Sequence, residues 1–252
     1  MDRKQQLLER LNAITRSLSA TGQALALLGL GSVGIETDRL DDYSDLDFFA
    51  IVKPGSKRWF LTRLDWLNSV CPLAYHFPNT VDGFKVLYAD GIFCEFAVFE
   101  PQELSEIPFA NGRIVWKEAG FDETMCMPHP VQRAEHSTEW SLGEALTNLY
   151  IGLGRLKRGE KLSATRFIQG HAVDRVIDLT KSIEAARPIH EDAFGSERRY
   201  EARFPATASH LPEWVQGYER NVESARAILA FLEQHFEVNT AMRAAILALC
   251  EP

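Results

Sequence analysis

The stretch LGLGSVGIETDRLDDYSDLDFFAIV, residues 28–52, decides the interpretation of this chain because it places carboxylates where a strand is expected. Asp45 and Asp47 alternate with apolar residues, so in a strand both side chains point to the same face. Neighbouring carboxylates repel each other, and ionised carboxylates resist burial. Basic side chains or a divalent cation are the usual compensation, and Mg²⁺ is typically held by one or two carboxylates together with substrate phosphates. The stretch therefore favours a Mg²⁺ site at the start of this strand.

Gly31 and Ser32 lie upstream of the carboxylates, directly after ALALLGL, residues 24–30, which predicts a short buried strand. Glycine permits a tight turn and a close backbone approach. A serine hydroxyl and nearby backbone N–H groups can hold a phosphate, as anion-binding nests do. The glycines at 29, 31 and 34 also match the letters of a dinucleotide-binding fingerprint, but no regular strand–helix–strand unit follows them. We therefore expect a phosphate-binding turn outside a dinucleotide-binding fold.

Glu95 is the only charged residue in the second arm of an expected hairpin, FKVLYADGIFCEFAVF, residues 84–99. The dipeptide Asp90-Gly91 between the arms suits a type I′ turn, whose central residues need positive φ. If this hairpin lies beside the strand of the first two carboxylates, all three carboxylates converge. The alternative is that Glu95 forms a buried salt bridge with Lys85 across the hairpin.

The remaining pattern divides the chain into a mixed half and a helical half. Helices are expected at 3–19 and 56–70, and a further strand at 112–117. Later helices are expected at 136–158, 163–186, 212–235 and 239–250, with a short piece near 196–203. We therefore expect an α+β fold class: an N-terminal domain with a mixed β-sheet and flanking helices over residues 1–130, and a C-terminal α-helical bundle domain over residues 131–252.

Composition excludes several functional classes. The chain has 252 residues and a formal net charge of −8, which argues against a nucleic-acid binder because such proteins need a basic face. No stretch is long and apolar enough to span a bilayer, and the charged first residues do not resemble a signal peptide. We therefore expect a cytoplasmic protein with no membrane partner. Four scattered cysteines without a CxxC pair argue against a zinc site or a disulfide framework.

These motifs resemble the nucleotidyltransferase superfamily that includes DNA polymerase β. Its motif is an apolar residue, Gly, then Gly or Ser, followed after roughly nine to thirteen residues by Asp–apolar–Asp/Glu–apolar. Leu30-Gly31-Ser32 and Asp45-Leu46-Asp47-Phe48 match that pattern. Glu95 fits the third family carboxylate, although Asp is frequent there. The departure leaves open whether Glu95 would bind metal or act as the general base.

The helical half is similar to the C-terminal domain of bacterial antibiotic nucleotidyltransferases. The similarity lies in LYIGLGRLKRGEKLSATRFIQGHAVDRVIDL, residues 149–179, and SERRYEARFP, residues 196–205. The lincosamide nucleotidyltransferases are the most similar group, followed by streptomycin-type aminoglycoside adenylyltransferases. The resemblance implies Mg²⁺-dependent transfer of a nucleoside monophosphate, from ATP or another NTP, to a hydroxyl of a small-molecule acceptor, with release of pyrophosphate.

The resemblance also assigns roles to particular residues. The catalytic and metal-binding residues would be Asp45, Asp47 and Glu95, and the nucleotide-binding residues would be Gly31, Ser32, Lys161 and Arg166. Alternative acceptors are an aminoglycoside or a protein, and a different class of function is a non-catalytic nucleotide-binding regulatory protein of the same fold. The apolar segment at 241–250 could serve a homodimer interface, but a helical core explains it equally well.

Overall fold

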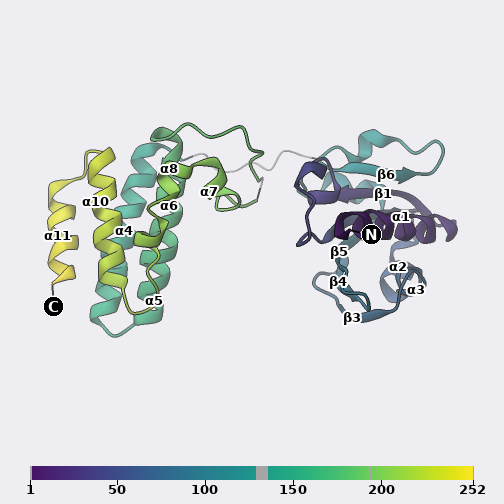
Figure 1. The fold of residues 1–252 in the computed structure, drawn as a ribbon, viewed down its shortest axis with the longest axis horizontal. Helices are drawn as coiled ribbons and strands as arrows, with labels where there is room; N and C mark the ends of the chain where they lie inside the picture. Colours follow the sequence, from purple (N-terminus) through teal and green to yellow (C-terminus); the bar gives the residue numbers. More distant parts are fainter. Residues whose placement is uncertain (1, 129–135, 193, 252) are drawn as a thin grey trace. The chain divides into compact units, whose positions relative to one another are not determined.

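The computed structural model describes residues 2–128, 136–192 and 194–251, and the chain divides into two compact units, Met1–Gln132 and Arg133–Pro252 (Figure 1). The first unit combines a β-sheet with helices, and the second is helical. The expected α+β class with a helical C-terminal region is therefore confirmed. The domain boundary expected at residue 130 lies outside the described residues. In the part of the chain that is described, no helix is long and apolar enough to cross a membrane.

A six-stranded sheet forms the centre of the first unit, in the order β3-β4-β5-β2-β1-β6. The strands are β1 (Ala24–Leu30), β2 (Leu46–Val52), β3 (Leu73–Phe77), β4 (Gly83–Tyr88), β5 (Phe93–Phe99) and β6 (Arg113–Lys117). β2 and β5 run parallel, and the other neighbouring pairs are antiparallel. Five strands match expected segments to within one residue at each end, whereas the edge strand β3 is not expected from the sequence.

The two faces of the sheet carry different cores. Even-numbered residues of β2 point into the larger core, which helix α1 (Arg3–Ala20) covers with its apolar stripe of Leu7, Leu11, Ile14 and Leu18. Ile51 of β2 and Phe99 of β5 belong to a smaller cluster. Because side chains alternate along a strand, Asp47 and Glu95 share the face of that smaller cluster. The carboxylates thus avoid the main hydrophobic core.

The helix expected over residues 56–70 is instead two short helices, α2 (Lys57–Thr62) and α3 (Asp65–Asn68). Arg63 between them is extended, with φ −133° and ψ 106°. The break allows Trp66 to enter the core, where its ring packs edge-on against Phe60 with centroids 5.7 Å apart. Burial of this large ring therefore stabilises the fold more than the continuous helix that the local spacing predicts would.

The second unit packs around one long helix, α4 (Thr138–Lys157). The other helices are α5 (Lys161–Arg166), a π turn (Phe167–Ala172), α6 (Val173–Leu179), α7 (Tyr200–Arg203), α8 (Pro205–Ala208), α9 (Leu211–Trp214), α10 (Asn221–His235) and α11 (Thr240–Cys250). Figure 1 shows α10 and α11 alongside α4. Gly152 of α4 permits a close approach to the π turn, because a Cβ there would lie 2.6 Å from Ile168 Cγ1.

Two of the helices expected in this unit are interrupted. The segment 163–186 contains the π turn, and its regular α-helix ends at Leu179. The segment 212–235 is divided into α9 and α10, and Gly217 between them has φ +97°, a left-handed backbone that favours glycine. Both interruptions shape the neighbourhood of α5, which carries two residues predicted to bind the nucleotide.

Candidate active site

The sheet brings two of the predicted carboxylates side by side. Asp47 on β2 pairs in register with Glu95 on β5, and the two side chains project from the same face. Asp45 lies directly before β2, two positions ahead of Asp47. All three residues are partly exposed. The condition for the carboxylates to converge, a hairpin beside β2, is therefore met.

Glu95 already has two partners in this unit. Its carboxylate accepts a hydrogen bond from Asn79 Nδ2 at 2.8 Å and forms an ion pair with Lys85 Nζ at 3.2 Å. Both charged side chains are 42% exposed, so the ion pair lies at the surface rather than in the core. Among the described residues, no group of three or more His, Cys, Asp and Glu side chains is placed so that it could hold a metal ion. The role of Glu95 as metal ligand or general base stays a prediction.

Gly31 lies against the carboxylate of Asp47. Leu30 pairs with Asp47 in the β1–β2 register, so the chain that leaves β1 starts beside that side chain. Gly31 has φ +53°, and a Cβ on it would lie 2.9 Å from Asp47 Oδ2. Only glycine combines this backbone conformation with so close an approach. The two halves of the motif, which a loop separates in sequence, therefore meet in the fold.

Ser32 belongs to a single 3₁₀ turn, Gly31–Val33, and is 7% exposed. The N–H of Gly34 donates to Gly31 O at 3.1 Å and closes the turn. A Cβ on Gly29 would lie 2.7 Å from Val33 O, and one on Gly34 would lie 3.0 Å from Gly29 O. The glycines at 29, 31 and 34 thus fold the chain closely against itself and against Asp47. Close packing of the backbone therefore explains why these three positions are glycines and happen to match the pattern of a dinucleotide-binding fingerprint.

Arg113 is a contact of this turn that sequence reasoning misses. It is the first residue of β6 and pairs in register with Gly29 on β1. Its Nη2 donates to Val33 O at 3.1 Å and its Nε to Gly34 O at 3.3 Å. No local pattern around Arg113 marks it, because the contact exists only once β6 has joined β1.

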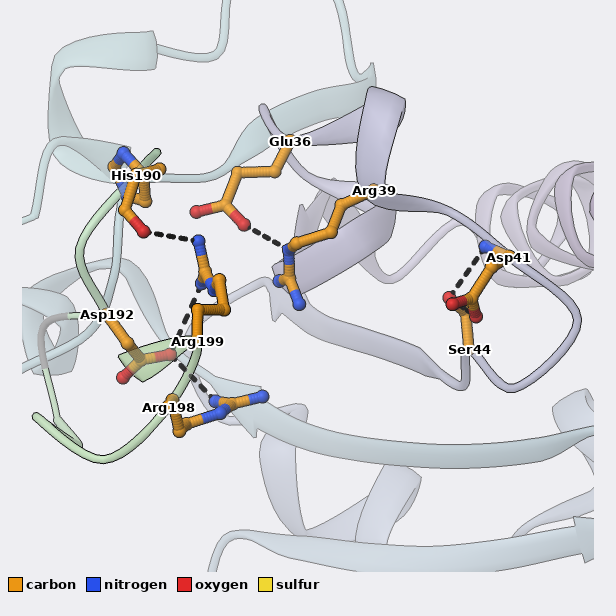
Figure 2. A network of polar contacts seen from close by, with 8 residues as sticks. All are labelled: Glu36, Arg39, Asp41, Ser44, His190, Asp192, Arg198 and Arg199. Atoms are coloured by element: carbon orange, nitrogen blue, oxygen red, sulfur yellow. Dashed lines mark hydrogen bonds and ion pairs between the residues drawn. The ribbon is translucent and has the colours of Figure 1, made fainter. Parts of the chain in front are cut away.

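The loop between the turn and β2 is held by its own polar contacts, which Figure 2 shows together with a network from the second unit. Glu36 and Arg39 form an ion pair. The carboxylate of Asp41 accepts a hydrogen bond from the Ser44 hydroxyl at 2.9 Å. This hydrogen bond, with those from backbone N–H groups of the same turn, lowers the pKa of Asp41. Asp41 therefore caps the loop just before β2.

Cys94, adjacent to Glu95, faces the larger core and is fully buried. Burial raises the pKa of its thiol above the usual range, Arg10 opposes this shift, and the carboxylates of Asp47 and Asp45 reinforce it. The thiolate is the nucleophilic form of cysteine. Cys94 is therefore a core residue rather than a nucleophile of the candidate site.

Lys161 and Arg166, the two cations predicted in the helical unit, line one hollow of about 430 Å³. Lys161 begins α5, forms an ion pair with Glu219 and lies over the Tyr218 ring, with Nζ 4.7 Å from the ring centroid. Arg166 is exposed at the end of the same helix, and Tyr218 is 49% exposed. The hollow therefore presents two cations beside an accessible aromatic ring.

A buried polar network fixes one wall of this hollow. Gln169 in the π turn donates to Gly217 O and accepts from Gly217 N–H, both at 2.8 Å, and it also donates to Asn221 Oδ1 at 2.8 Å. The amide of Asn221 donates to Thr165 Oγ1 at 3.0 Å and to Tyr218 O at 2.9 Å. Buried amides are stable in a protein interior only when they are paired. The network therefore holds the backbone of Tyr218 in one place.

Asp192 organises the loop before α7, and Figure 2 shows it between two arginines. Asp192 is 8% exposed, and its carboxylate accepts hydrogen bonds from the backbone N–H of Phe194 at 2.9 Å and from Arg198 Nη1 at 2.8 Å. Burial alone would raise the pKa of Asp192, but these hydrogen bonds and the arginine charges outweigh burial and lower it. Arg199 donates to His190 O at 2.7 Å from a backbone with φ +62°, a conformation that no other non-glycine residue in the described ranges adopts.

Comparison with known proteins finds matches among solved structures. No protein-family model and no curated protein matches the chain. Solved structures do match, among them an aminoglycoside 6-adenyltransferase from Bacillus subtilis. The two chains are 10% identical, and the match has a TM-score of 0.39 over 99% of this chain and 98% of the other. A similarity of this size identifies neither a reaction nor a substrate.

Proposed function

We propose that this chain is a Mg²⁺-dependent nucleotidyltransferase that transfers AMP from ATP to a hydroxyl of a small lincosamide-type antibiotic and releases pyrophosphate. The observation that carries the proposal is the contact of the Gly31–Ser32 turn with Asp47, which itself lies in register with Glu95. Phosphoryl transfer needs a phosphate-binding turn next to carboxylates that can hold a metal ion. The lincosamide acceptor rests on the resemblance of the helical half.

The carboxylates fit a magnesium ion that is shared with substrate better than an ion enclosed by protein. Asp45 and Asp47 supply two carboxylates, and Mg²⁺ commonly completes its coordination with waters and phosphate oxygens. Glu95 would have to exchange its Lys85 partner to become a third ligand. When bound, the ion neutralises charge on the triphosphate as pyrophosphate leaves.

The chain's own residues would orient the substrates and move one proton. Ser32 and the N–H groups of its turn would hold the β- or γ-phosphate. The acceptor oxygen bonds to the α-phosphorus, the bond from that phosphorus to the bridging oxygen breaks, and pyrophosphate leaves with the electron pair. Glu95 would accept the proton of the attacking hydroxyl. Lys161 and Arg166 would add positive charge to the phosphates.

A non-catalytic nucleotide-binding protein is the second candidate, and the contacts of Glu95 favour it. The carboxylate of Glu95 pairs with Lys85 and Asn79 at the surface of the hairpin, so it has a structural role that needs no metal ion. Such a protein would bind ATP with little gain in affinity from Mg²⁺, whereas the enzyme needs the ion. Calorimetric titration of ATP with and without Mg²⁺ separates the two functions.

The direct test is mass spectrometry of reactions that contain Mg²⁺, ATP or GTP, and lincomycin, clindamycin, streptomycin or kanamycin. A drug that gains the mass of a nucleoside monophosphate supports the transfer reaction and identifies the acceptor class. We expect Asp47→Asn to reduce turnover by at least about 100-fold. Asp42→Asn, a matched change at an exposed residue of the preceding loop, should keep it. Equal turnover in both variants would contradict the site.

A further inference from the structure

We propose that Arg113 is a positioning residue, which holds the Gly31–Val33 turn in the conformation that receives a phosphate. The inference rests on the proposed function, because it assigns to Arg113 the task of orienting the turn that carries Ser32. Arg113 itself acts through the backbone of Val33 and Gly34. Its expected substrate effect is therefore on the nucleotide and not on the acceptor.

The two hydrogen bonds of Arg113 fix two successive peptide planes. The Val33 and Gly34 carbonyls both accept from one guanidinium, at 3.1 and 3.3 Å. A trans peptide is planar, so a carbonyl held on the side of Arg113 directs the next N–H to the opposite side. The N–H of Gly34 accordingly donates to Gly31 O and closes the turn. Arg113 thus supports the hydrogen bond that closes the turn around Ser32.

The turn needs an external brace because glycines surround it. Gly29, Gly31 and Gly34 have more backbone freedom than any other residue type, so their peptides can rotate at little steric cost. A rotation of the Val33–Gly34 peptide would break the hydrogen bond from Gly34 N–H to Gly31 O and open the turn that carries Ser32. The open turn would misplace Ser32 and so weaken binding of the triphosphate.

A guanidinium suits this task better than an ammonium. It is planar and rigid, and its donors form a fork that can reach two carbonyls at once. Its positive charge strengthens both hydrogen bonds, and it also attracts an anion that occupies the turn. The register of Arg113 with Gly29 places the start of its side chain beside the turn. A lysine ammonium also has several donors, but it lacks the planar fork and would hold the two carbonyls less rigidly.

The test combines hydrogen exchange with steady-state kinetics on the full chain. Arg113→Ala should speed amide exchange in a peptide that covers residues 29–36 and leave exchange in β5 unchanged. It should raise the KM for ATP by roughly 10- to 100-fold, since small misplacements of a binding group have effects of that size, while the KM for the acceptor stays constant. Arg113→Lys should give intermediate values. Lys117→Ala, at the other end of β6 in an ion pair with Glu123, is the matched control and should resemble the wild type.

Each outcome bears on the proposal. Unchanged exchange at residues 29–36 in both Arg113→Ala and Arg113→Lys would overturn the proposal, even if ATP binding weakened. A direct contact between Arg113 and phosphate would then explain the weaker binding. Faster exchange throughout the first unit in both Arg113→Ala and Arg113→Lys would also overturn the proposal, since Arg113 would then support the fold as a whole. The exchange measurement needs no substrate. A wild-type chain that transfers no nucleotide would therefore refute the proposed function. Hydrogen exchange would still show whether Arg113 holds the Gly31–Val33 turn.

Discussion

Replacing Gly31 with alanine should separate the strain of a left-handed backbone from the displacement of a carboxylate. An alanine at φ +53° pays the usual penalty of an L-residue in that region, about 1–2 kcal/mol. Gly22 has a similar φ of +66°, and a Cβ there would have no neighbour within 4 Å. Gly22→Ala is therefore a control with the same strain and no new contact.

The additional effect at Gly31 can be worked out from one distance. The new Cβ would lie 2.9 Å from Asp47 Oδ2, whereas carbon–oxygen contacts normally lie at about 3.3–3.6 Å. The carboxylate must then retreat by roughly 0.4 Å or rotate away, which approaches the ~0.5 Å tolerance of a functional group. Because a misplacement of about 1 Å can reduce a rate by about 100-fold, we expect kcat/KM to fall by about tenfold.

The assay follows both quantities in the same pair of variants. Urea-dependent hydrogen exchange in peptides of β1 and β2 reports the stability of the first unit, and we expect Gly31→Ala and Gly22→Ala to lose similar amounts. Formation of pyrophosphate at limiting ATP reports kcat/KM, and we expect only Gly31→Ala to lose activity. Equal activity in the two variants would refute the reasoning, because the position of Asp47 would then not matter to the reaction.

Two further predictions concern charges in the helical unit. Glu219→Gln should tighten ATP binding by up to about fivefold at low salt, because it removes the exposed partner of Lys161, and such pairs contribute only about 0.2–1 kcal/mol; calorimetry should show no change for the control Glu223→Gln, and equal affinities in both variants would exclude Lys161 from the phosphate site. Asp192→Asn should lower the free energy of unfolding of this unit by about 1.5–3 kcal/mol at pH 7, through loss of hydrogen bonds to a charged group. Because folding lowers the pKa of Asp192, its stabilisation is complete above the unfolded value of about 3.9 and is lost as the pH falls through the folded value. Urea unfolding followed by circular dichroism should therefore show the full difference at pH 7 and a progressively smaller one as the pH falls below about 4; a pH-independent difference would rule out the charge as its cause.

Elements with local causes could be predicted from the sequence. ALALLGL is a continuous apolar run and forms β1 over the expected residues. Asp90-Gly91 lies in the turn between β4 and β5 as expected, but only Gly91 has positive φ, at +82°, so the turn is not of the expected type I′. The register brings Lys85 opposite Glu95, so their ion pair could be foreseen as an alternative. The motif that contains Gly31, Asp45 and Asp47 can also be recognised in the sequence, because residue type and spacing define it.

Features with distant causes could not be predicted. β3 has four exposed residues out of five, so burial leaves no alternating pattern in its sequence. The break at Arg63 depends on where Trp66 packs, and the contact of Arg113 with Val33 joins residues 80 apart in the chain. Within the π turn, Gln169 pairs with Asn221, which lies 52 residues further along the chain. In each case the partner that decides the conformation lies outside the window that local spacing can show.

The parallel pairing of β2 with β5 also sets the order in which the site can assemble. All the chain from Lys53 to Ile92, including two helices and two strands, lies between these paired strands. Closing so long a loop costs entropy before any contact is gained, which makes such pairings slow. The turn at Gly31 and the strand of Asp47 can meet earlier through the antiparallel β1–β2 pair. During synthesis on a ribosome, the β1–β2 pair that brings Gly31 to Asp47 can therefore form before Glu95 has emerged.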